Sequence, residues 1–254
     1  MRKSKVLNEL KNGNFVGLPH IWTIPHWKIV DLLGYIGFPG VWIENEHGDF
    51  SEGEISQMIL AARAHDMDAI VRIPRRDYTD TIKVLEAGAT GVIVPHCMGV
   101  DDAKEIVKNA RFHPIGLRGQ GGSVDAEYHV NFNSAEYFKN GNSEIFLAVM
   151  IEDKEAVDEV EQIAALDGID LILVGPGDLA QSYGVIGEMK HPIINEAIDK
   201  VATASKKHGK FWGTPALDME YLKWLKKKGC LFTEIGVETD ALINFFTEAK
   251  TKYS

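Results

Sequence analysis

The sequence predicts a (β/α)8 barrel, an α/β fold in which eight parallel strands alternate with helices. Three observations predict it. Short apolar, β-branched segments alternate with longer amphipathic ones, eight such pairs can be counted, and the 254 residues match the roughly 250 of this fold. The apolar segments are continuous, as expected of strands covered on both faces. A doubly wound open sheet would show the same alternation, because one sequence does not reveal strand order.

The predicted strands are short apolar runs, and no Pro- or Ser-rich linker separates them. We therefore expect residues 1–254 to form a single domain. The eight strands are Phe15–Leu18, Val41–Glu44, Ala69–Ile73, Gly91–Pro95, Ile145–Glu152, Asp170–Gly175, Lys210–Gly213 and Leu231–Gly236.

The predicted helices lie between these strands, and several carry end signals. Ser51 and Glu54 form a capping-box pattern before a helix that runs to Ala64, and Asp77 can cap the helix that follows it. An extra helix precedes the first strand, and the segment 116–142 shows no assignable pattern. The remaining helices are Lys3–Lys11, Trp27–Tyr35, Thr79–Ala87, Asp101–Asn109, Lys154–Ala165, Pro192–Lys207, Met219–Lys228 and Asp240–Lys250.

The composition excludes several classes of protein. Asp and Glu number 37 against 27 Lys and Arg, a net charge of −10, which argues against nucleic acid as the main partner. No apolar run approaches the roughly 18 residues of a membrane span, and the basic start lacks a signal peptide's long apolar stretch. Two cysteines cannot form a disulfide framework. We expect a cytoplasmic protein with no membrane partner.

Two acidic residues follow neighbouring predicted strands, at the end of a barrel where active sites lie. Glu152 ends an apolar run and shares a strand face with Met150, while Asp178 follows a Gly-Pro-Gly turn. Carboxylates without thiolate or paired-His ligands suit a hard ion such as Mg²⁺ or Mn²⁺. The alternative is that both residues only cap the helices that follow them.

Other polar residues at the same rim could carry chemistry. His47 is a candidate acid or base that Glu44 or Glu46 could orient, although a lone His is more often structural. Arg72 lies within an apolar run, where its charge demands an anionic partner or a carboxylate substrate. Trp22 could line a pocket or simply pack at the rim. His96 and Cys97 could suggest a soft-metal site, but no second Cys lies nearby.

Several of these segments together resemble the HpcH/HpaI class II aldolases, relatives of the citrate lyase β-subunit barrels. The resemblance extends over nearly the whole chain. The segments that carry it are Gly37-Phe38, Ile43–His47, Val71-Arg72, Pro95, Gly116–Gly119, Val149–Glu152 and Gly175–Leu179.

The resemblance implies a barrel of the phosphoenolpyruvate/pyruvate type that cleaves a 4-hydroxy-2-oxo acid to pyruvate, or a close analogue, and an aldehyde. The family's metal carboxylates fall on Glu152 and Asp178, with Mg²⁺ or Mn²⁺ expected and Co²⁺ as a further option. Its catalytic histidine falls on His47 and its enolate-stabilising arginine on Arg72. The amides at Gly177 and Asp178 could hold the substrate carboxylate.

The resemblance also implies a homo-hexamer, a trimer of dimers that exchange the C-terminal helix Asp240–Lys250. Three positions depart from the family. Glu44 stands where an Asp often pairs with the catalytic histidine, and Glu86 stands where an Asp often reaches a neighbouring subunit's site. Met150 replaces a glutamine common beside the metal glutamate, which removes a polar group from the barrel interior.

We therefore predict a divalent-metal-dependent aldolase with two alternatives. One is a lyase for acyl-CoA thioesters such as malyl-CoA, for which Arg75-Arg76 is the obvious phosphate-binding candidate. The other is a non-catalytic barrel that binds a 2-oxo acid without turning it over, which Met150 suggests.

Overall fold

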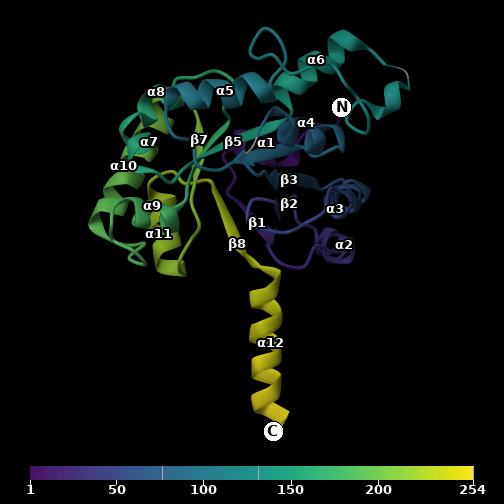
Figure 1. The fold of residues 1–254 in the computed structure, drawn as a ribbon. Helices are drawn as coiled ribbons and strands as arrows, with labels where there is room; N and C mark the ends of the chain where they lie inside the picture. Colours follow the sequence, from purple (N-terminus) through teal and green to yellow (C-terminus); the bar gives the residue numbers. More distant parts are fainter. Residues whose placement is uncertain (76, 131, 254) are drawn as a thin grey trace.

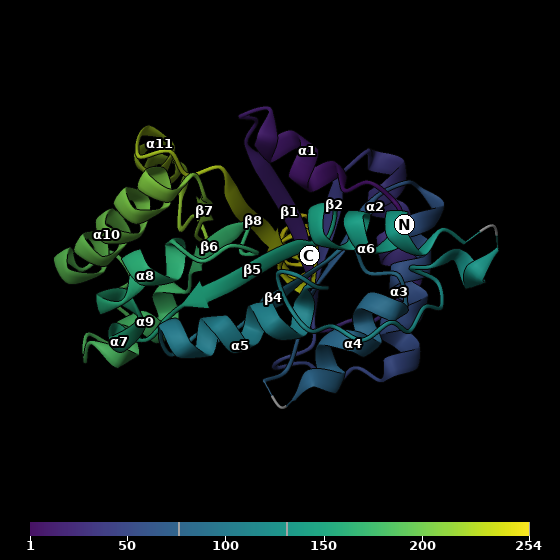
Figure 2. The same cartoon turned by 90° about the horizontal axis from the view of Figure 1, so that it is seen from above.

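A computed structural model describes residues 1–75, 77–130 and 132–253, and its eight parallel strands close into a barrel in chain order. The predicted (β/α)8 fold is confirmed, and β8 pairs with β1 to complete the circle (Figures 1 and 2). The strands are β1 (Val16–Ile21), β2 (Gly40–Glu44), β3 (Asp68–Arg72), β4 (Gly91–Val94), β5 (Phe146–Ile151), β6 (Leu171–Val174), β7 (Phe211–Gly213) and β8 (Phe232–Val237).

Helices surround the strands, with α2, α3 and α4 on one side and α8, α10 and α11 on the other (Figure 2). They are α1 (Lys5–Lys11), α2 (Trp27–Ile36), α3 (Glu52–Ala64), α4 (Tyr78–Glu86), α5 (Val100–Ala110), α6 (Ser134–Ser143), α7 (Lys154–Asp158), α8 (Val160–Ala164), α9 (Pro176–Ser182), α10 (Pro192–His208), α11 (Met219–Lys227) and α12 (Glu238–Tyr253).

The predicted end signals form as expected. Ser51 and Glu54 make both hydrogen bonds of a capping box, and Asp77 accepts a hydrogen bond from the Thr79 amide. One predicted helix, 154–165, is divided at Glu159, whose backbone is not helical and whose carboxylate binds the Val100 amide. Helices α6 and α9 were not predicted, the first because it lies in the unassigned segment.

The core has two layers, which follow from the alternation of side chains along each strand. Leu18, Trp42, Ile70 and Phe146 belong to the cluster inside the barrel, whereas residues such as Val41 face the helices. Phe146, Ala148 and Met150 share the inner face of β5, since all three lie in the inner cluster.

Helix α1 closes the amino-terminal end of the barrel. Its residues Val6, Leu7 and Leu10 pack into the inner cluster. Asp68, at the start of β3, accepts hydrogen bonds from the Ser4 hydroxyl at 2.6 Å and the Val6 amide at 2.9 Å. The opposite end, where the strands finish, therefore carries the polar side chains.

Helix α12 extends away from the barrel (Figure 1). It buries none of its residues, although Leu242, Ile243, Phe245 and Phe246 are apolar. Its first residue, Glu238, accepts hydrogen bonds at 2.7 Å from the amides of Trp22, Thr23 and Ile24. Among the described residues, no helix combines the length and apolar character needed to cross a membrane.

Candidate active site

The rim formed by β1, β2 and β3 holds a buried network of paired charges. Arg72 donates through Nε to Glu44 Oε2 at 2.7 Å, and the Nε2 atom of His20 lies 3.2 Å from the same oxygen. His20 Nδ1 lies 2.8 Å from Glu234 Oε2. The other Glu44 oxygen accepts the amides of Glu46 and His47. Both oxygens of this buried carboxylate are therefore satisfied.

These contacts decide how Glu44 and His20 titrate. Burial opposes ionisation of Glu44, but the hydrogen bond to His20 and the charge of Arg72 prevail and lower its pKa to about 2. Burial likewise lowers the pKa of His20, yet its bonds to Glu234 and Glu44 outweigh this and leave the pKa raised. Glu44 is therefore ionised near neutral pH.

His20 was placed after the first strand by the sequence, but it lies within β1. The strand continues through Pro19 to Ile21 and pairs with β2 at His20 and Ile21. The ring of His20 stacks on Trp42 with the ring centroids 4.6 Å apart. Pro19, which has no backbone N–H donor, lies at the irregularity between Leu18 and His20 in the pairing of β1 with β8.

His47 lies at the mouth of the site, and its side chain is half exposed. Its Nε2 atom is 3.6 Å from Glu46 Oε2, while Glu44 contacts only its backbone amide. The structure therefore does not pair Glu44 with the His47 ring, and the carboxylate near that ring is Glu46. Trp22 connects the two regions, because its ring centroid is 5.8 Å from that of His47 and 5.3 Å from Cζ of Arg72.

The rim formed by β4, β5 and β6 holds acidic groups instead. Glu152 is 2% exposed, and its Oε1 accepts the His96 amide at 2.6 Å. One ligand atom each from His96, Glu152 and Asp178 lie within 4.8 Å of one another. A side chain at Gly175 would place its Cβ 2.4 Å from Glu152 Oε2, so glycine makes room for this carboxylate.

This donor set fits a divalent cation. In the described part of the chain, neither Glu152 nor Asp178 forms an ion pair with Lys or Arg. Burial accordingly raises the pKa of Glu152 to about 7. Two carboxylates and an imidazole within reach of one point are common ligands for such ions, and a cation there would offset the cost of the buried charge.

His96 is the site residue that the sequence reasoning set aside. It was considered only with Cys97 as a soft-metal pair, but the Cys97 thiol contacts the Gly99 carbonyl and burial raises its pKa to about 12. The signal that could have identified His96 was its place after β4, equivalent to that of Glu152 after β5.

Two residues join these halves of the rim. Glu46 Oε2 lies 3.2 Å from Arg72 Nη1, and its Oε1 lies 3.8 Å from His96 Nε2. Met150 is buried, with Sδ 3.9 Å from Arg72 Nη1. Arg72 Nη2 is buried and has no hydrogen-bond partner among the described residues. It is therefore a donor available to a substrate oxygen.

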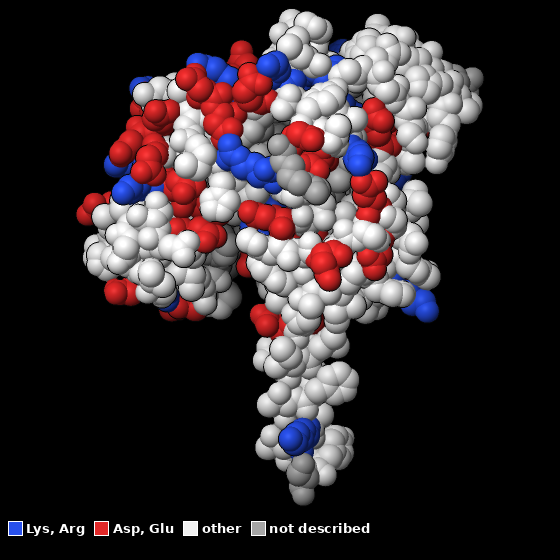
Figure 3. All heavy atoms as spheres, in the orientation of Figure 1, with Lys and Arg blue, Asp and Glu red and all other residues white. Residues whose placement is uncertain are grey.

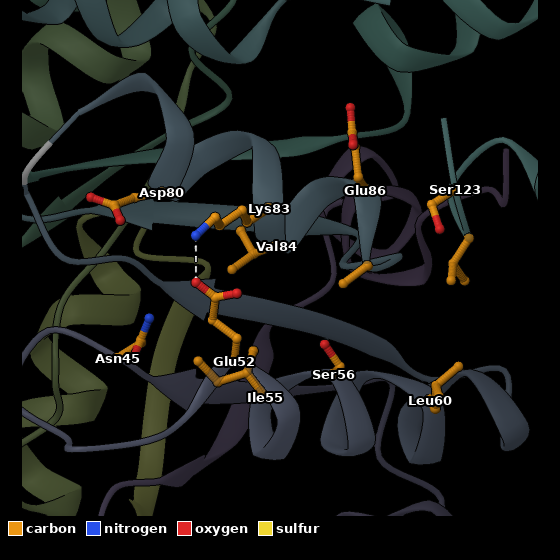
Figure 4. A pocket seen from close by; sticks show the side chains of 12 residues that line it. Asn45, Glu52, Ile55, Ser56, Leu60, Asp80, Lys83, Val84, Glu86 and Ser123 are labelled. Carbon is orange, nitrogen blue, oxygen red and sulfur yellow. Dashed lines mark hydrogen bonds and ion pairs between the residues drawn. The ribbon is translucent and has the colours of Figure 1, made fainter. Parts of the chain in front are cut away.

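Gly177 and Glu86 lie apart from these contacts. Gly177 is in the first turn of α9, and a Cβ added there would meet nothing within 4 Å. Glu86 ends α4 and is half buried, beside a flank pocket of about 370 Å³ between α3 and α4. In Figure 4 its carboxylate points away from the Glu52–Lys83 pair.

A closed barrel with acidic and cationic groups at the carboxyl ends of its strands is the arrangement of a (β/α)8 enzyme. Residues 33–245 match the HpcH/HpaI aldolase/citrate lyase family, and the chain belongs to it. The resemblance inferred from the sequence motifs is confirmed.

Similar proteins carry aldolase names. A hydroxypyruvate/pyruvate aldolase of Sagittula stellata is 30% identical over 226 residues, which cover 89% of this chain and 87% of that protein. A 5-keto-4-deoxy-D-glucarate aldolase of an Enterobacter species is 30% identical, with 81% and 80% covered. The crystal structure of an HpcH/HpaI aldolase from Desulfitobacterium hafniense superposes with a TM-score of 0.90 at 27% identity, covering 97% and 95%.

Proposed function

We propose that this protein is a divalent-metal-dependent aldolase that cleaves a 4-hydroxy-2-oxo acid to pyruvate, or a close analogue, and an aldehyde. The observation that carries the proposal is the arrangement of His96, Glu152 and Asp178, whose carboxylates form no ion pair with Lys or Arg among the described residues, together with a buried Arg72 whose Nη2 donor has no partner there. The aldolase names of similar proteins support the same reaction class.

Glu152 and Asp178 are the residues that would hold the cation. Bound there, Mg²⁺, Mn²⁺ or Co²⁺ would supply positive charge that lowers the cost of forming an enolate from the 2-oxo acid. Arg72 adds charge of its own where the enolate oxygen develops, since Nη2 is buried and available. The pairing of its Nε with Glu44 fixes the direction of the guanidinium.

We propose that His47 moves a proton at the aldehyde side of the substrate. It lies at the exposed mouth rather than in the buried network, so its ring can reach the 4-hydroxyl of a bound substrate. Trp22 lies between His47 and Arg72, and a Cβ added at Gly177 would meet nothing within 4 Å, which leaves room for a substrate carboxylate beside this residue.

The decisive experiment is hydrogen–deuterium exchange at the methyl group of pyruvate, followed by NMR with Mn²⁺ or Mg²⁺ and then with chelator. We expect exchange that requires the metal and stops in Glu152→Gln. Glu155→Gln, an exposed glutamate nearby, is the matched control. Absence of metal-dependent exchange in folded protein would overturn the proposal. A panel of aldehydes with pyruvate and hydroxypyruvate then identifies the substrate.

We also propose that the protein is a homo-oligomer, a hexamer built as a trimer of dimers. Helix α12 exposes four apolar residues on an element without a buried face, and α2 exposes Leu32, Tyr35 and Ile36. Exposed apolar area of this kind is expected to be covered by a partner. Light scattering should give six times the 28.2 kDa chain mass, and Phe245→Glu should lower it.

Glu86 is proposed to reach the site of a neighbouring subunit in this hexamer. Its position at the end of α4, away from Glu152 and Asp178 of its own chain, motivates that role. Glu86→Gln should then lower turnover while leaving the mass of the assembly unchanged.

The acyl-CoA lyase alternative depends on a basic surface near the barrel mouth. Arg75 is paired with Asp102, and Arg76 lies outside the described residues. On the face drawn in Figure 3, Lys and Arg are interspersed with Asp and Glu. Cleavage of malyl-CoA without cleavage of free oxo acids would favour this alternative. Turnover that Glu152→Ala abolishes in folded protein would eliminate the non-catalytic one.

A further inference from the structure

We propose that His96 is a third protein ligand of the divalent cation and that its imidazole makes the site prefer Mn²⁺ and Co²⁺ over Mg²⁺. The inference rests on the proposed function, because it concerns the cation of the same site. It adds a ligand that the sequence motifs do not contain.

The backbone of His96 has an unusual conformation that serves this geometry. Its φ is +46°, in the left-handed region that costs an ordinary L-residue about 1 kcal/mol. In this conformation the His96 amide donates to Glu152 Oε1 at 2.6 Å, while one ring nitrogen stays within 4.8 Å of the carboxylates of Glu152 and Asp178. Backbone strain of this kind is often found at functional sites.

Asp153 orients the imidazole of His96. Its Oδ2 atom lies 3.1 Å from His96 Nδ1. The same nitrogen lies 3.9 Å from Glu152 Oε1, whereas Nε2 lies 3.8 Å from Glu46 Oε1. A carboxylate behind a ligating histidine fixes both the tautomer and the direction of the ring.

The neighbouring side chains leave this role to His96. Met150 directs Sδ toward Arg72 Nη1 and offers no oxygen or nitrogen. Cys97 is buried with its thiol against the Gly99 carbonyl, on the far side of the β4 end from the inner cluster. Of the residues after β4, His96 is therefore the one with a metal-binding atom near Glu152 and Asp178.

An imidazole ligand changes which ion binds best. Mg²⁺ prefers oxygen ligands and retains its waters, whereas imidazole nitrogen suits transition metals. A set of two carboxylates and one imidazole should therefore favour Co²⁺ and Mn²⁺ at equal concentrations of the competing ions.

The test measures metal binding directly on the full-length protein. Mn²⁺, Co²⁺ and Mg²⁺ are titrated calorimetrically into metal-free wild type, His96→Gln and the control His208→Gln, whose histidine ends α10 at the opposite end of the barrel. The Co²⁺ absorption spectrum and nitrogen couplings in pulsed EPR of the Mn²⁺ protein report an imidazole ligand. We expect His96→Gln to lose the nitrogen coupling and at least about tenfold in Mn²⁺ and Co²⁺ affinity, with a smaller loss for Mg²⁺.

Asp153→Asn provides a second variant that keeps the imidazole. It should weaken Mn²⁺ binding by about 10-fold or more while retaining the nitrogen coupling. An unchanged coupling and unchanged affinities in His96→Gln would overturn this inference but leave the proposed function intact if Glu152→Gln still loses the metal. Failure of the wild type to bind any of the three ions would overturn both.

Discussion

Glu44 and Glu152 are both buried glutamates at the carboxyl end of a barrel strand, yet they titrate in opposite directions. Glu44 is surrounded by Arg72, His20 and two amides, and its pKa is about 2. Glu152 receives one amide and no Lys or Arg ion pair among the described residues, and its pKa is about 7. Position in the fold does not decide the charge of a buried carboxylate; its neighbours do.

The comparison shows that the two halves of the rim differ in how their charged side chains are paired. The half formed by β1–β3 has its charges paired within the protein, whereas Glu152 and Asp178 in the half formed by β4–β6 form no ion pair with Lys or Arg among the described residues. Under the proposed function, a bound cation supplies the positive charge that the second half lacks. The predictions below test this separation.

The largest effect is expected for Glu152→Gln, which removes a donor from the incomplete half. Loss of the cation should lower the rate of pyruvate methyl exchange by at least about 10³-fold, because several kcal/mol of charge stabilisation are lost. Calorimetry should show no Mn²⁺ binding, and circular dichroism should show a retained fold. Mn²⁺ binding at wild-type affinity would contradict the assignment of Glu152.

Arg72→Lys tests the paired half on its own. Lysine keeps the positive charge beside Glu44 but cannot place a second donor where Nη2 lies. The exchange rate should fall by about 10²-fold, while the Mn²⁺ dissociation constant should stay within about threefold of the wild type. Arg75→Lys is the control. A loss of metal affinity as large as that of Glu152→Gln would show that the halves are not separable.

Glu44→Gln tests the charge network through stability. The folded-state pKa of Glu44, about 2, lies below its ordinary 4.5. The ionised carboxylate therefore stabilises the fold above pH 4.5, and this contribution is lost as the pH falls from 4.5 toward 2. We expect wild type to exceed Glu44→Gln by about 3 kcal/mol in unfolding free energy at neutral pH, with the gap narrowing in acid.

Urea unfolding at several pH values, with Glu155→Gln as the control, measures this gap. A difference between wild type and Glu44→Gln that is the same at pH 7 and pH 3 would contradict the pKa of Glu44.

The smallest effect is expected for Trp22→Phe, because Trp22 only lines the site between His47 and Arg72. The contact with Arg72 weakens by about 0.5–1 kcal/mol, which corresponds to a 2- to 5-fold rise in KM. The turnover number should change less than KM. Steady-state kinetics of cleavage would show it, and an effect on Mn²⁺ affinity would place Trp22 closer to the cation than we propose.

The fold was largely predictable from the sequence because its signals are local. Continuous apolar runs mark the buried strands, and Ser51, Asp77 and Gly209 mark helix ends. Helix α6 was not predictable in this way, since its residues from Ser134 to Ser143 combine a Gly with several polar side chains. The true length of β1 was hidden by Pro19, although the strand tolerates it.

The candidate site was predictable only where a residue sits at the end of a strand. Glu152, Asp178 and Arg72 follow that rule, and the structure brings the first two within reach of one ion. The contacts of His20 with Glu44 and Glu234 were not predictable, because His20 and Glu234 come from β1 and β8, the two strands that close the barrel. Contacts between the first and last strands leave no pattern in sequence spacing.

Glu238 accepts hydrogen bonds from three backbone amides, and these bonds join the start of α12 to the loop that carries Trp22. Any tilt of α12 must therefore be transmitted to Trp22 and its loop. If α12 packs against a second subunit, dilution of the protein would separate the subunits. Substrate recognition would then change before the barrel itself did.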